Sequence, residues 1–420
     1  MTFSRQVAWQ ALLIASFLAL NPWLSEAQPW PNPLRHTLRH DTAGLGRVLA
    51  HPAAYRLQIL HTRVRRDAAG RPHFRSYRYR LRPREYFYPA STVKLAAAAL
   101  ALEKLRALRA QVPSLGPESV MLTDASFAGQ TGAQRDTSAA SGRPSVANYV
   151  RKALLVSDND AFNRLYEFVG PAELNAGLAR LGLRRSRLLH RLSVGDQEPA
   201  SRHTNPIAFF ADTAATQVLY RQPAAFYSGA WPKAPRRQPS IGRAHLSGDQ
   251  LVNTPLDFSQ KNAFSLPDLQ QMLRAVLFPE TVPSARRLRL APDDYALLRQ
   301  ALSQLPRESG RPRYDVAHYP DTYAKFLLGG GGTTPLPPGV RVFNKIGQAY
   351  GFLIDNAYVV DEAKGIEFLL SAVLYVNADG VLNDDKYEYD TIGFPFLRDL
   401  GLRVYEAECR QKLRASTKNK

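Results

Sequence analysis

The sequence predicts an α+β protein, in which helices flank an antiparallel sheet that is built from both chain ends. Two observations support this fold class. Two strand-like runs lie near the start of the chain and three more lie near its end, with several helix-like runs between them. No internal repeat divides the chain into equal units. We therefore expect one sheet that both chain ends complete, with an all-helical subdomain inserted between its two parts.

The first part of the sheet is expected over residues 55–64 and 77–84, with turn residues 67–72 between them. In the second run arginines alternate with mostly apolar residues. A period of two places these arginines on a solvent face of the strand. Before the strands, residues 34–49 have the pattern of an amphipathic helix.

The middle of the chain is mainly helical. A helix is expected to begin near Ser91, and its apolar character on nearly all sides from Leu95 to Leu102 indicates a buried helix. Residues 221–261 are rich in Pro, Gly and Arg and lack periodicity, so a long irregular insertion is expected there. Further helices are expected over residues 148–155, 161–169, 172–181, 206–219, 266–277 and 293–305.

The end of the chain is expected to complete the sheet. Its apolar or alternating runs are residues 341–345, 350–360 and 366–375, and a closing helix is expected over 389–400. We divide the chain into a signal peptide, 1–27; a linker and N-terminal helix, 28–50; the main domain, 51–405; and a basic C-terminal tail, 406–420.

The first residues have the features of an export signal. Arg5 supplies a positive charge, residues 7–20 are largely apolar, and Ser25 and Ala27 are small residues at the positions that a signal peptidase reads. An uncleaved membrane anchor is the alternative, but the apolar run is shorter than the ~18 residues that a span needs. We expect a cleaved signal and a secreted or periplasmic protein.

The chain carries a formal charge of +19, with 55 Lys+Arg against 36 Asp+Glu. Nucleic acid is the usual partner for such a charge, but export argues against it. An exported basic surface meets anionic lipids and wall polymers instead, and a merely solvated surface is the alternative. Cys409 is the only cysteine, so no intramolecular disulfide can form. We expect a monomer that binds neither nucleic acid nor a cofactor. We also expect no bound metal, because no His or Cys cluster in the sequence has metal-ligand spacing.

The motif Ser91-x-x-Lys94 carries the clearest chemical signal. A hydroxyl and an amine three residues apart at the start of a helix lie on one face, which places a nucleophile beside a base. Taken alone, the pair is common, and a helix cap with a solvated lysine is the alternative. The buried character of the following helix argues against that alternative, because an unpaired buried ammonium is costly.

Two later motifs follow in chain order, Ser157-Asp158-Asn159 and Lys345-Ile346-Gly347. With Ser91-x-x-Lys94 they resemble the motif set of the serine β-lactamase and penicillin-binding protein superfamily, class A most closely. Further segments that resemble this family are residues 88–91, 157–163, 170–182 and 350–357. The resemblance spans about residues 55–402, with a divergent stretch over 221–338.

The resemblance implies an acyl-enzyme mechanism. Ser91 would attack an acyl carbonyl, and Lys94 would hold its proton. Burial and nearby cations would lower the pKa of Lys94. Ser157 would relay a proton to the leaving nitrogen.

The resemblance also implies a substrate-binding set. Asn159 would hold the substrate amide, and Lys345 would attract a substrate carboxylate. Gly347 would let the substrate approach the strand backbone closely. The N–H groups of Ser91 and Gln348 would form an oxyanion hole.

Two positions depart from the family pattern. Ile346 stands where a hydroxyl residue usually binds the substrate carboxylate. Class A enzymes also use a loop glutamate to activate the deacylating water, and Glu198 is the candidate here. The family's asparagine three residues on is absent, since Ser201 stands there. Without such a base, Ser91 would acylate and stall.

We therefore expect a secreted or periplasmic serine hydrolase of the class A β-lactamase type. It would form an acyl-enzyme on Ser91 with a β-lactam or a related cyclic amide, as part of an antibiotic response. Peptidoglycan-derived stems with a D-Ala-D-Ala end and simple esters are alternative substrates. A catalytically weak module that binds the anionic cell envelope with the same fold is the second hypothesis.

Overall fold

The computed structural model of the 420-residue chain describes residues 32–39, 44–195, 198–233 and 239–418. The expected signal peptide, residues 1–27, lies outside the described residues. In the part of the chain that is described, every helix is too short or too polar to cross a membrane.

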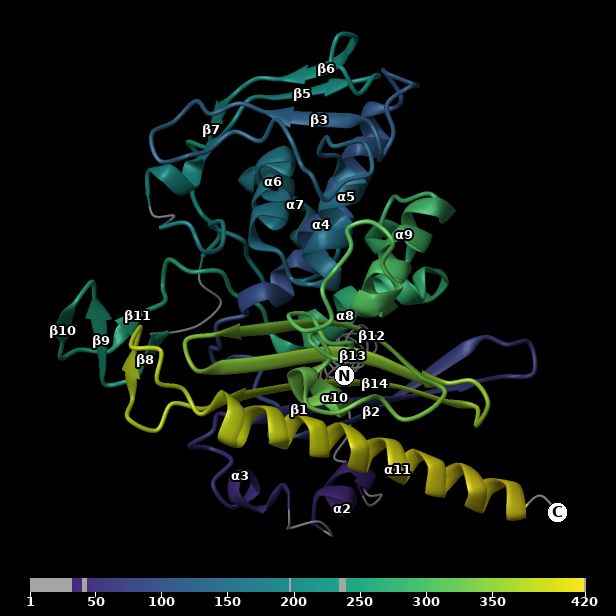
Figure 1. The fold of residues 1–420 in the computed structure, drawn as a ribbon. Coiled ribbons are helices and arrows are strands. Elements are labelled where there is room, and N and C mark those ends of the chain that lie inside the picture. The colour runs from purple at the N-terminus through teal and green to yellow at the C-terminus, as the bar shows by residue number, and fades with distance from the viewer. Residues whose placement is uncertain (1–31, 40–43, 196–197, 234–238, 419–420) are drawn as a thin grey trace, which may run out of the picture.

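A five-stranded antiparallel sheet forms the centre of the molecule, with the strand order β12-β13-β14-β1-β2 (Figure 1). The early strand β1 pairs with the late strand β14, with Gln58 opposite Val373. Both chain ends therefore complete one sheet, as the sequence predicts. The strands are β1, Gln58–Arg66; β2, Pro72–Tyr79; β12, Val340–Ala349; β13, Phe352–Asp361; and β14, Ile366–Tyr375.

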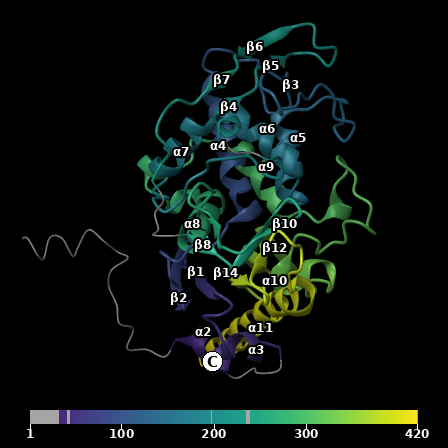
Figure 2. The same ribbon diagram turned by 90° about the vertical axis from the view of Figure 1, so that its left-hand side faces the viewer.

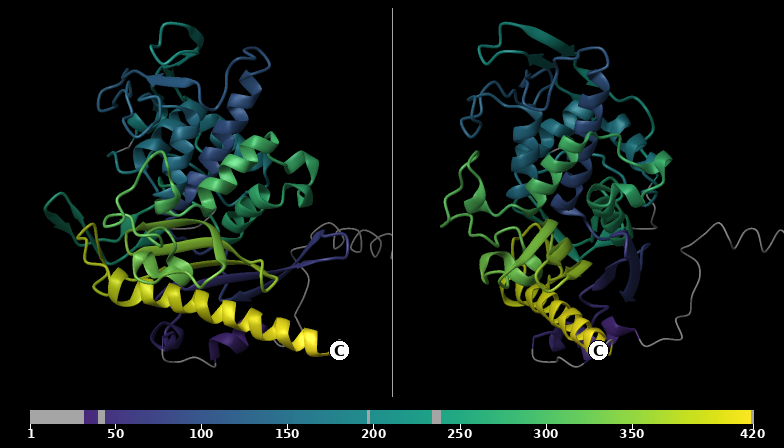
Figure 3. Two further views of the ribbon diagram at one scale, coloured as in Figure 1. Left: turned by 45° about the vertical axis from the view of Figure 1, so that its right-hand side comes forward. Right: turned by 90° about the vertical axis from the view of Figure 1, so that its right-hand side faces the viewer.

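Helices cover both faces of this sheet (Figure 1). The face towards the large helical region carries α4, Lys94–Leu108; α5, Val146–Leu155; α6, Asn159–Val169; α7, Pro171–Arg180; α8, Leu266–Leu277; and α9, Pro292–Ser303. The other face carries α2, Pro33–Arg39; α3, Gly46–Ala50; α10, Phe326–Gly329; and α11, Phe394–Lys418. Figure 2 shows α2, α3 and α11 gathered on that face, and Figure 3 shows α11 running along it.

The hydrophobic core lies on both sides of the sheet. Along β13, Ile354 packs into the cluster around α4, whereas its neighbour Leu353 packs into the cluster around α11. Because successive side chains of a strand point to opposite faces, a sheet covered on both faces needs apolar residues at nearly every position. This explains the nearly continuous apolar runs in β13 and β14. The fold class is thus the predicted mixed architecture with an antiparallel sheet.

One expected helix is absent. Residues 206–219 form two strands and a turn instead of a helix. Strand β5, Ile207–Phe210, pairs with β3, Val120–Thr123, and with β6, Val218–Gln222. The Asp212 carboxylate accepts hydrogen bonds from the N–H groups of Thr216 and Gln217, which stabilises the turn. Aromatic and β-branched residues favour strands once a partner strand is present, and local sequence does not reveal that partner.

The expected irregular insertion contains several short strands. They are β7, Ala225–Phe226; β8, Ser240–Ile241; β9, Ala244–Ser247; β10, Gln250–Val252; and β11, Leu256–Asp257. Strand β9 pairs in parallel with β15, Val381–Leu382, and β7 pairs with β4, His203–Thr204. Through the pairing of β9 with β15, the insertion is therefore hydrogen-bonded to a strand near the end of the chain.

Both ends of the described chain also differ from expectation. The expected helix over 34–49 is described as two short helices, α2 and α3. The closing helix begins at Phe394 and continues to Lys418, so the expected boundary at residue 405 falls inside α11.

Candidate active site

The structure places Ser91 and Lys94 at the start of the central helix. Ser91 lies in the 3-10 turn Ala90–Val93, and Lys94 is the first residue of α4. Ala90 has a positive φ of 46°, a conformation that is unfavourable for a residue with a side chain. The four successive alanines that follow are fully buried, so their small side chains let α4 pass through the middle of the helical region. The nucleophile candidate is thus held by a buried helix.

The Lys94 amine lies among four oxygen atoms. Its Nζ is 2.8 Å from Ser91 Oγ, 2.6 Å from Asn159 Oδ1 and 3.2 Å from Ser157 Oγ, and it also contacts the Ser157 carbonyl oxygen. Amide and carbonyl oxygens can only accept, whereas the Ser91 hydroxyl can donate. A neutral amine can therefore donate to Asn159 and to the Ser157 carbonyl while its lone pair accepts the Ser91 proton.

Burial favours this neutral form of Lys94. The side chain is fully buried, and desolvation lowers its pKa from 10.5 to about 7, although the Asp158 carboxylate acts in the opposite direction. A substantial fraction of Lys94 is therefore neutral near pH 7. This matches the lowered pKa that the family resemblance implies.

Ser157 lies between two lysines. Its Oγ is 3.2 Å from Lys94 Nζ and 2.8 Å from Lys345 Nζ. Lys345 projects from β12 and is fully buried, and burial together with the positive charge of Lys94 lowers its pKa. Ser157 has a positive φ of 65°, which turns the chain just before α6. The three predicted motifs therefore meet at one point although they are far apart in the sequence.

Asn159 occupies the first turn of α6. The Asp158 side chain caps this helix by accepting a hydrogen bond of 2.8 Å from Ala161 N. The Asn159 side chain accepts from Lys94 through Oδ1 and donates to Ser193 Oγ at 2.8 Å through Nδ2. Its amide is thus fixed by partners on both sides.

Strand β12 forms one wall of the site. It is an edge strand of the sheet, so the N–H groups of alternate residues are not engaged by a neighbouring strand. A Cβ atom at Gly347 would lie 2.6 Å from the Pro89 carbonyl oxygen. Only glycine lets β12 approach the turn that carries Ser91 this closely. Ile346 and Gln348, on either side of Gly347, both line the cavity.

The cavity at Ser91 has a volume of about 780 Å³. Tyrosines from four parts of the chain line it: Tyr88, Tyr323, Tyr350, and Tyr387 with Tyr389. Tyr88 and Tyr350 pack edge to face with their ring centroids 5.0 Å apart. Among the described residues that line this cavity, Asp385 is the only carboxylate.

Glu198 is not brought to this cavity. Its carboxylate accepts a hydrogen bond of 3.0 Å from Arg202 Nη2 and another from Trp231 Nε1, and both bonds lower its pKa. The side chain is half exposed, and it does not line the space around Ser91. Its expected role as the deacylation base therefore has no support in this geometry.

Ser193 occupies the loop position that faces Asn159, and it belongs to no recognisable sequence motif. The backbone of its neighbour Leu192 is held on both sides by Asn163, with Leu192 N to Oδ1 at 2.8 Å and Nδ2 to Leu192 O at 2.9 Å. Ser193 itself has a positive φ of 56°. Serine is common in turns, so its presence there carries no chemical signal. Asp385 was missed for the same reason, because it lies among ordinary turn residues.

Comparison with known proteins supports the family resemblance. Residues 75–223 match the model of the Beta-lactamase enzyme family. This segment contains the first two motifs and lacks the third. A search of curated proteins finds no match to the chain. The family match, together with the ordered motifs, confirms the predicted resemblance to β-lactamase-like serine hydrolases.

Several solved structures are similar at low identity. A β-lactamase from Desulfarculus baarsii DSM 2075 is 20% identical over 86% of this chain and 97% of its own, with a TM-score of 0.47. A β-lactamase from Streptosporangium roseum is 19% identical over 87% of this chain and 100% of its own, with a TM-score of 0.46. One from Xanthomonas campestris pv. campestris is 17% identical over 89% and 97%, with a TM-score of 0.46.

Proposed function

We propose that this protein is an exported serine hydrolase of the class A β-lactamase type, which forms an acyl-enzyme on Ser91 with a β-lactam or a related amide. One observation carries the proposal. A buried lysine amine with a pKa of about 7 lies 2.8 Å from the hydroxyl of Ser91. Such a base can remove the serine proton near neutral pH.

Acylation uses three side chains in sequence. Neutral Lys94 takes the proton from Ser91 Oγ as this oxygen attacks the substrate carbonyl and forms a C–O bond. The proton then passes through the Ser157 hydroxyl to the substrate nitrogen as the C–N bond breaks. The Ser157 oxygen lies within 3.2 Å of Lys94 Nζ, which supports this route. With a cyclic amide the product is a single ring-opened acyl-Ser91 ester that carries the new amine, whereas a linear amide would release its amine.

The substrate lies against β12 in this proposal. The N–H groups of Ser91 and Gln348 would stabilise the oxyanion, and removal of one such donor typically costs ~3 kcal/mol in the transition state. Lys345 and Asn159 would hold the substrate carboxylate and amide. Ile346 supplies no hydroxyl, so Lys345 would bind the carboxylate without that second partner.

Deacylation is the weaker half of the reaction. Ser193 stands beside Asn159, and a serine hydroxyl is a much poorer base than a carboxylate. This observation favours a long-lived acyl-enzyme over rapid turnover. It also favours the second candidate function, a module of low turnover that captures cell-envelope amides such as D-Ala-D-Ala stems.

Covalent labelling tests the proposal. The folded protein is incubated with a fluorescent penicillin and, separately, with a fluorophosphonate, and the modified peptide is identified by mass spectrometry. We expect a mass increase on Ser91 with at least one reagent, and none in the Ser91→Ala variant. Folded protein that takes up neither reagent would contradict the proposal.

Persistence of the label separates the two candidate functions. Turnover of a chromogenic cephalosporin, with label lost within minutes, would indicate a hydrolase. A label that remains on Ser91 for hours would indicate covalent capture.

A further inference from the structure

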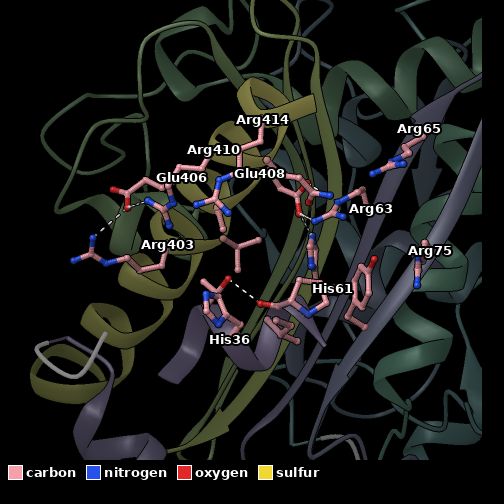
Figure 4. Close-up of a pocket in the computed structure, with 17 residues that line it drawn as sticks. His36, His61, Arg63, Arg65, Arg75, Arg403, Glu406, Glu408, Arg410 and Arg414 are labelled. Atoms are coloured by element: carbon pink, nitrogen blue, oxygen red, sulfur yellow. Dashed lines mark hydrogen bonds and ion pairs between the residues drawn. The ribbon is translucent and has the colours of Figure 1, made fainter. Parts of the chain in front are cut away.

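A second hollow lies on the sheet face opposite Ser91, between the β1–β2 hairpin, α2 and α11 (Figure 4). Its volume is about 980 Å³, and six arginines line it against two glutamates. We call it the arginine groove. Its arginines are Arg63, Arg65 and Arg75 from the hairpin and Arg403, Arg410 and Arg414 from α11.

The register of the hairpin places like charges opposite each other. Arg63 on β1 pairs with Arg75 on β2, and residues at alternate positions, such as Arg65, share their face. Like charges directly opposite on paired strands destabilise a sheet. An anion between them would remove this repulsion.

Of the three hairpin arginines, Arg63 alone has an acidic partner among the described residues. The buried Arg63 guanidinium binds the Glu408 carboxylate at both oxygens, at 2.7 and 2.6 Å. Figure 4 shows these two side chains pointing towards each other, with Arg65 and Arg75 beside them. Among the described residues Arg65 and Arg75 have no acidic partner, and Arg75 only lies over the Tyr77 ring at 5.6 Å. Two guanidinium groups therefore remain available at the groove.

His61 is the second observation that indicates a ligand. Its ring lines the groove and is 3% exposed, yet neither nitrogen makes a hydrogen bond to a described residue. Its Nε2 lies 3.3 Å from Glu408 Oε1 without the alignment of a hydrogen bond. A buried polar group without a partner is rare, and an absent ligand or water commonly accounts for it. The neutral ring would offer a ligand one N–H donor.

We propose that the arginine groove binds a phosphate group. One carboxylate, that of Glu408, already occupies Arg63, whereas the Arg65 and Arg75 guanidinium groups have no acidic partner among the described residues. A phosphate carries up to two negative charges and several acceptor oxygens, and the planar guanidinium fork matches it in a bidentate manner. On α11, Glu406 is shared by Arg403 at 3.1 Å and Arg410 at 3.7 Å, so this wall of the groove is positive as well.

The phosphate could be a small phosphorylated molecule or the headgroup of an anionic phospholipid. Both present the same group to the same arginines. Binding of glycerol 3-phosphate to the full chain is measured by calorimetry. Flotation with phosphatidylglycerol vesicles, compared with phosphatidylcholine vesicles, measures the lipid.

The test variant is Arg65→Ala with Arg75→Ala. Both residues are exposed, so we expect the fold to remain intact, and circular dichroism checks this. The control is Arg78→Ala with Arg82→Ala, which removes the same charge from exposed residues outside the groove. We expect phosphate or vesicle binding to weaken by about tenfold or more in the test variant and by less than about twofold in the control.

The outcomes separate the two sources. Groove-dependent binding of glycerol 3-phosphate alone identifies a small ligand, and groove-dependent binding of phosphatidylglycerol vesicles identifies a headgroup. Either result supports the groove. No binding of either probe, or equal losses in the test and control variants, would overturn the proposal. This experiment does not involve Ser91, so its result is independent of the labelling test.

Discussion

At the scale of single residues, the site depends on how burial changes two lysines. Lys94 and Lys345 both approach the Ser157 hydroxyl, and two full positive charges at this distance would repel each other. Loss of a proton from Lys94 relieves that repulsion. Desolvation lowers the pKa of both lysines, and the positive charge of Lys94 lowers the pKa of Lys345 further, so the pair favours a state in which a proton has been lost.

The pH dependence of labelling tests this assignment. Only neutral Lys94 can accept the serine proton, and its pKa is lowered to about 7. The neutral fraction grows as pH rises, so the rate constant for Ser91 labelling should increase through about pH 7 and level off above it. Single-turnover labelling with the fluorescent penicillin between about pH 5 and about pH 9 measures it. A midpoint near the ordinary lysine value of about 10 would contradict the role of Lys94.

A second prediction concerns Ser193. Its Oγ is 2.8 Å from Asn159 Nδ2, and Ser193 lines the same cavity as Ser91, so a carboxylate introduced there would share the cavity with the acyl group. The Ser193→Glu variant should therefore release the acyl group about 100-fold faster or more, which is the lower range of general-base catalysis. The rate at which label is lost from Ser91 measures this effect.

The matched control is Glu198→Ala, because Glu198 binds Arg202 and Trp231 outside the cavity. We expect no change in its rate of label loss. A large decrease in Glu198→Ala would instead restore Glu198 as the deacylation base.

The motif residues around Ser91 can be identified from the sequence, whereas the loop that carries Ser193 cannot. The spacing of a hydroxyl and an amine indicates a chemical role for Ser91 and Lys94, whereas Ser157 and Lys345 are indicated by the family resemblance. Ser193 and the exclusion of Glu198 depend on a loop conformation that tertiary contacts determine. The spacing of residues in the sequence does not reveal the two hydrogen bonds by which the Asn163 side chain holds the Leu192 backbone in this loop.

At the scale of elements, the contact between β12 and the turn before α4 assembles the site. Gly347 lies against the Pro89 carbonyl, and this contact sets the distance between Lys345 and Ser157. Strand patterns predicted β12 because its apolar residues alternate. Residues 206–219 are expected to form a helix from local sequence, which does not reveal that β5 pairs with β3 and with β6.

The Gly347→Ala variant tests this contact. A methyl group would meet the Pro89 oxygen at 2.6 Å and push β12 away from Ser91. A displacement of about 1 Å at a reacting centre can cost about 100-fold in rate, so labelling should slow by about that factor. Gly116→Ala is the control, because a Cβ there meets no atom within 4 Å. Equal labelling rates in the two variants would argue against a close β12 contact.

At the scale of the whole molecule, the basic charge and the expected export signal are both consistent with contact between this protein and an anionic envelope surface. Part of the basic charge is concentrated in the arginine groove, on the face opposite the candidate active site. A protein held to an anionic surface through that groove would keep the Ser91 cavity directed away from the surface. Composition alone indicated the charge, but only the register of β1 and β2 brings its arginines to one place.

Export itself is directly testable. When the full chain is expressed in a bacterial host, we expect cleavage after Ala27, so that the mature protein begins at Gln28. Intact-mass measurement of the periplasmic fraction shows the mature end. Replacement of Ala27 by a bulky residue should block cleavage. An uncleaved chain found only in the cytoplasm would contradict the expected localisation.

The pairing of β1 with β14 has a consequence for the time at which the protein becomes reactive. Ser91 and Lys94 leave the ribosome early, but Lys345 and β12 belong to the last fifth of the chain. The lysine beside Ser91 cannot lose its proton readily until the sheet closes over it and excludes water. An incompletely folded precursor would therefore be unreactive at Ser91. The serine would become reactive only after the last strands had joined the sheet.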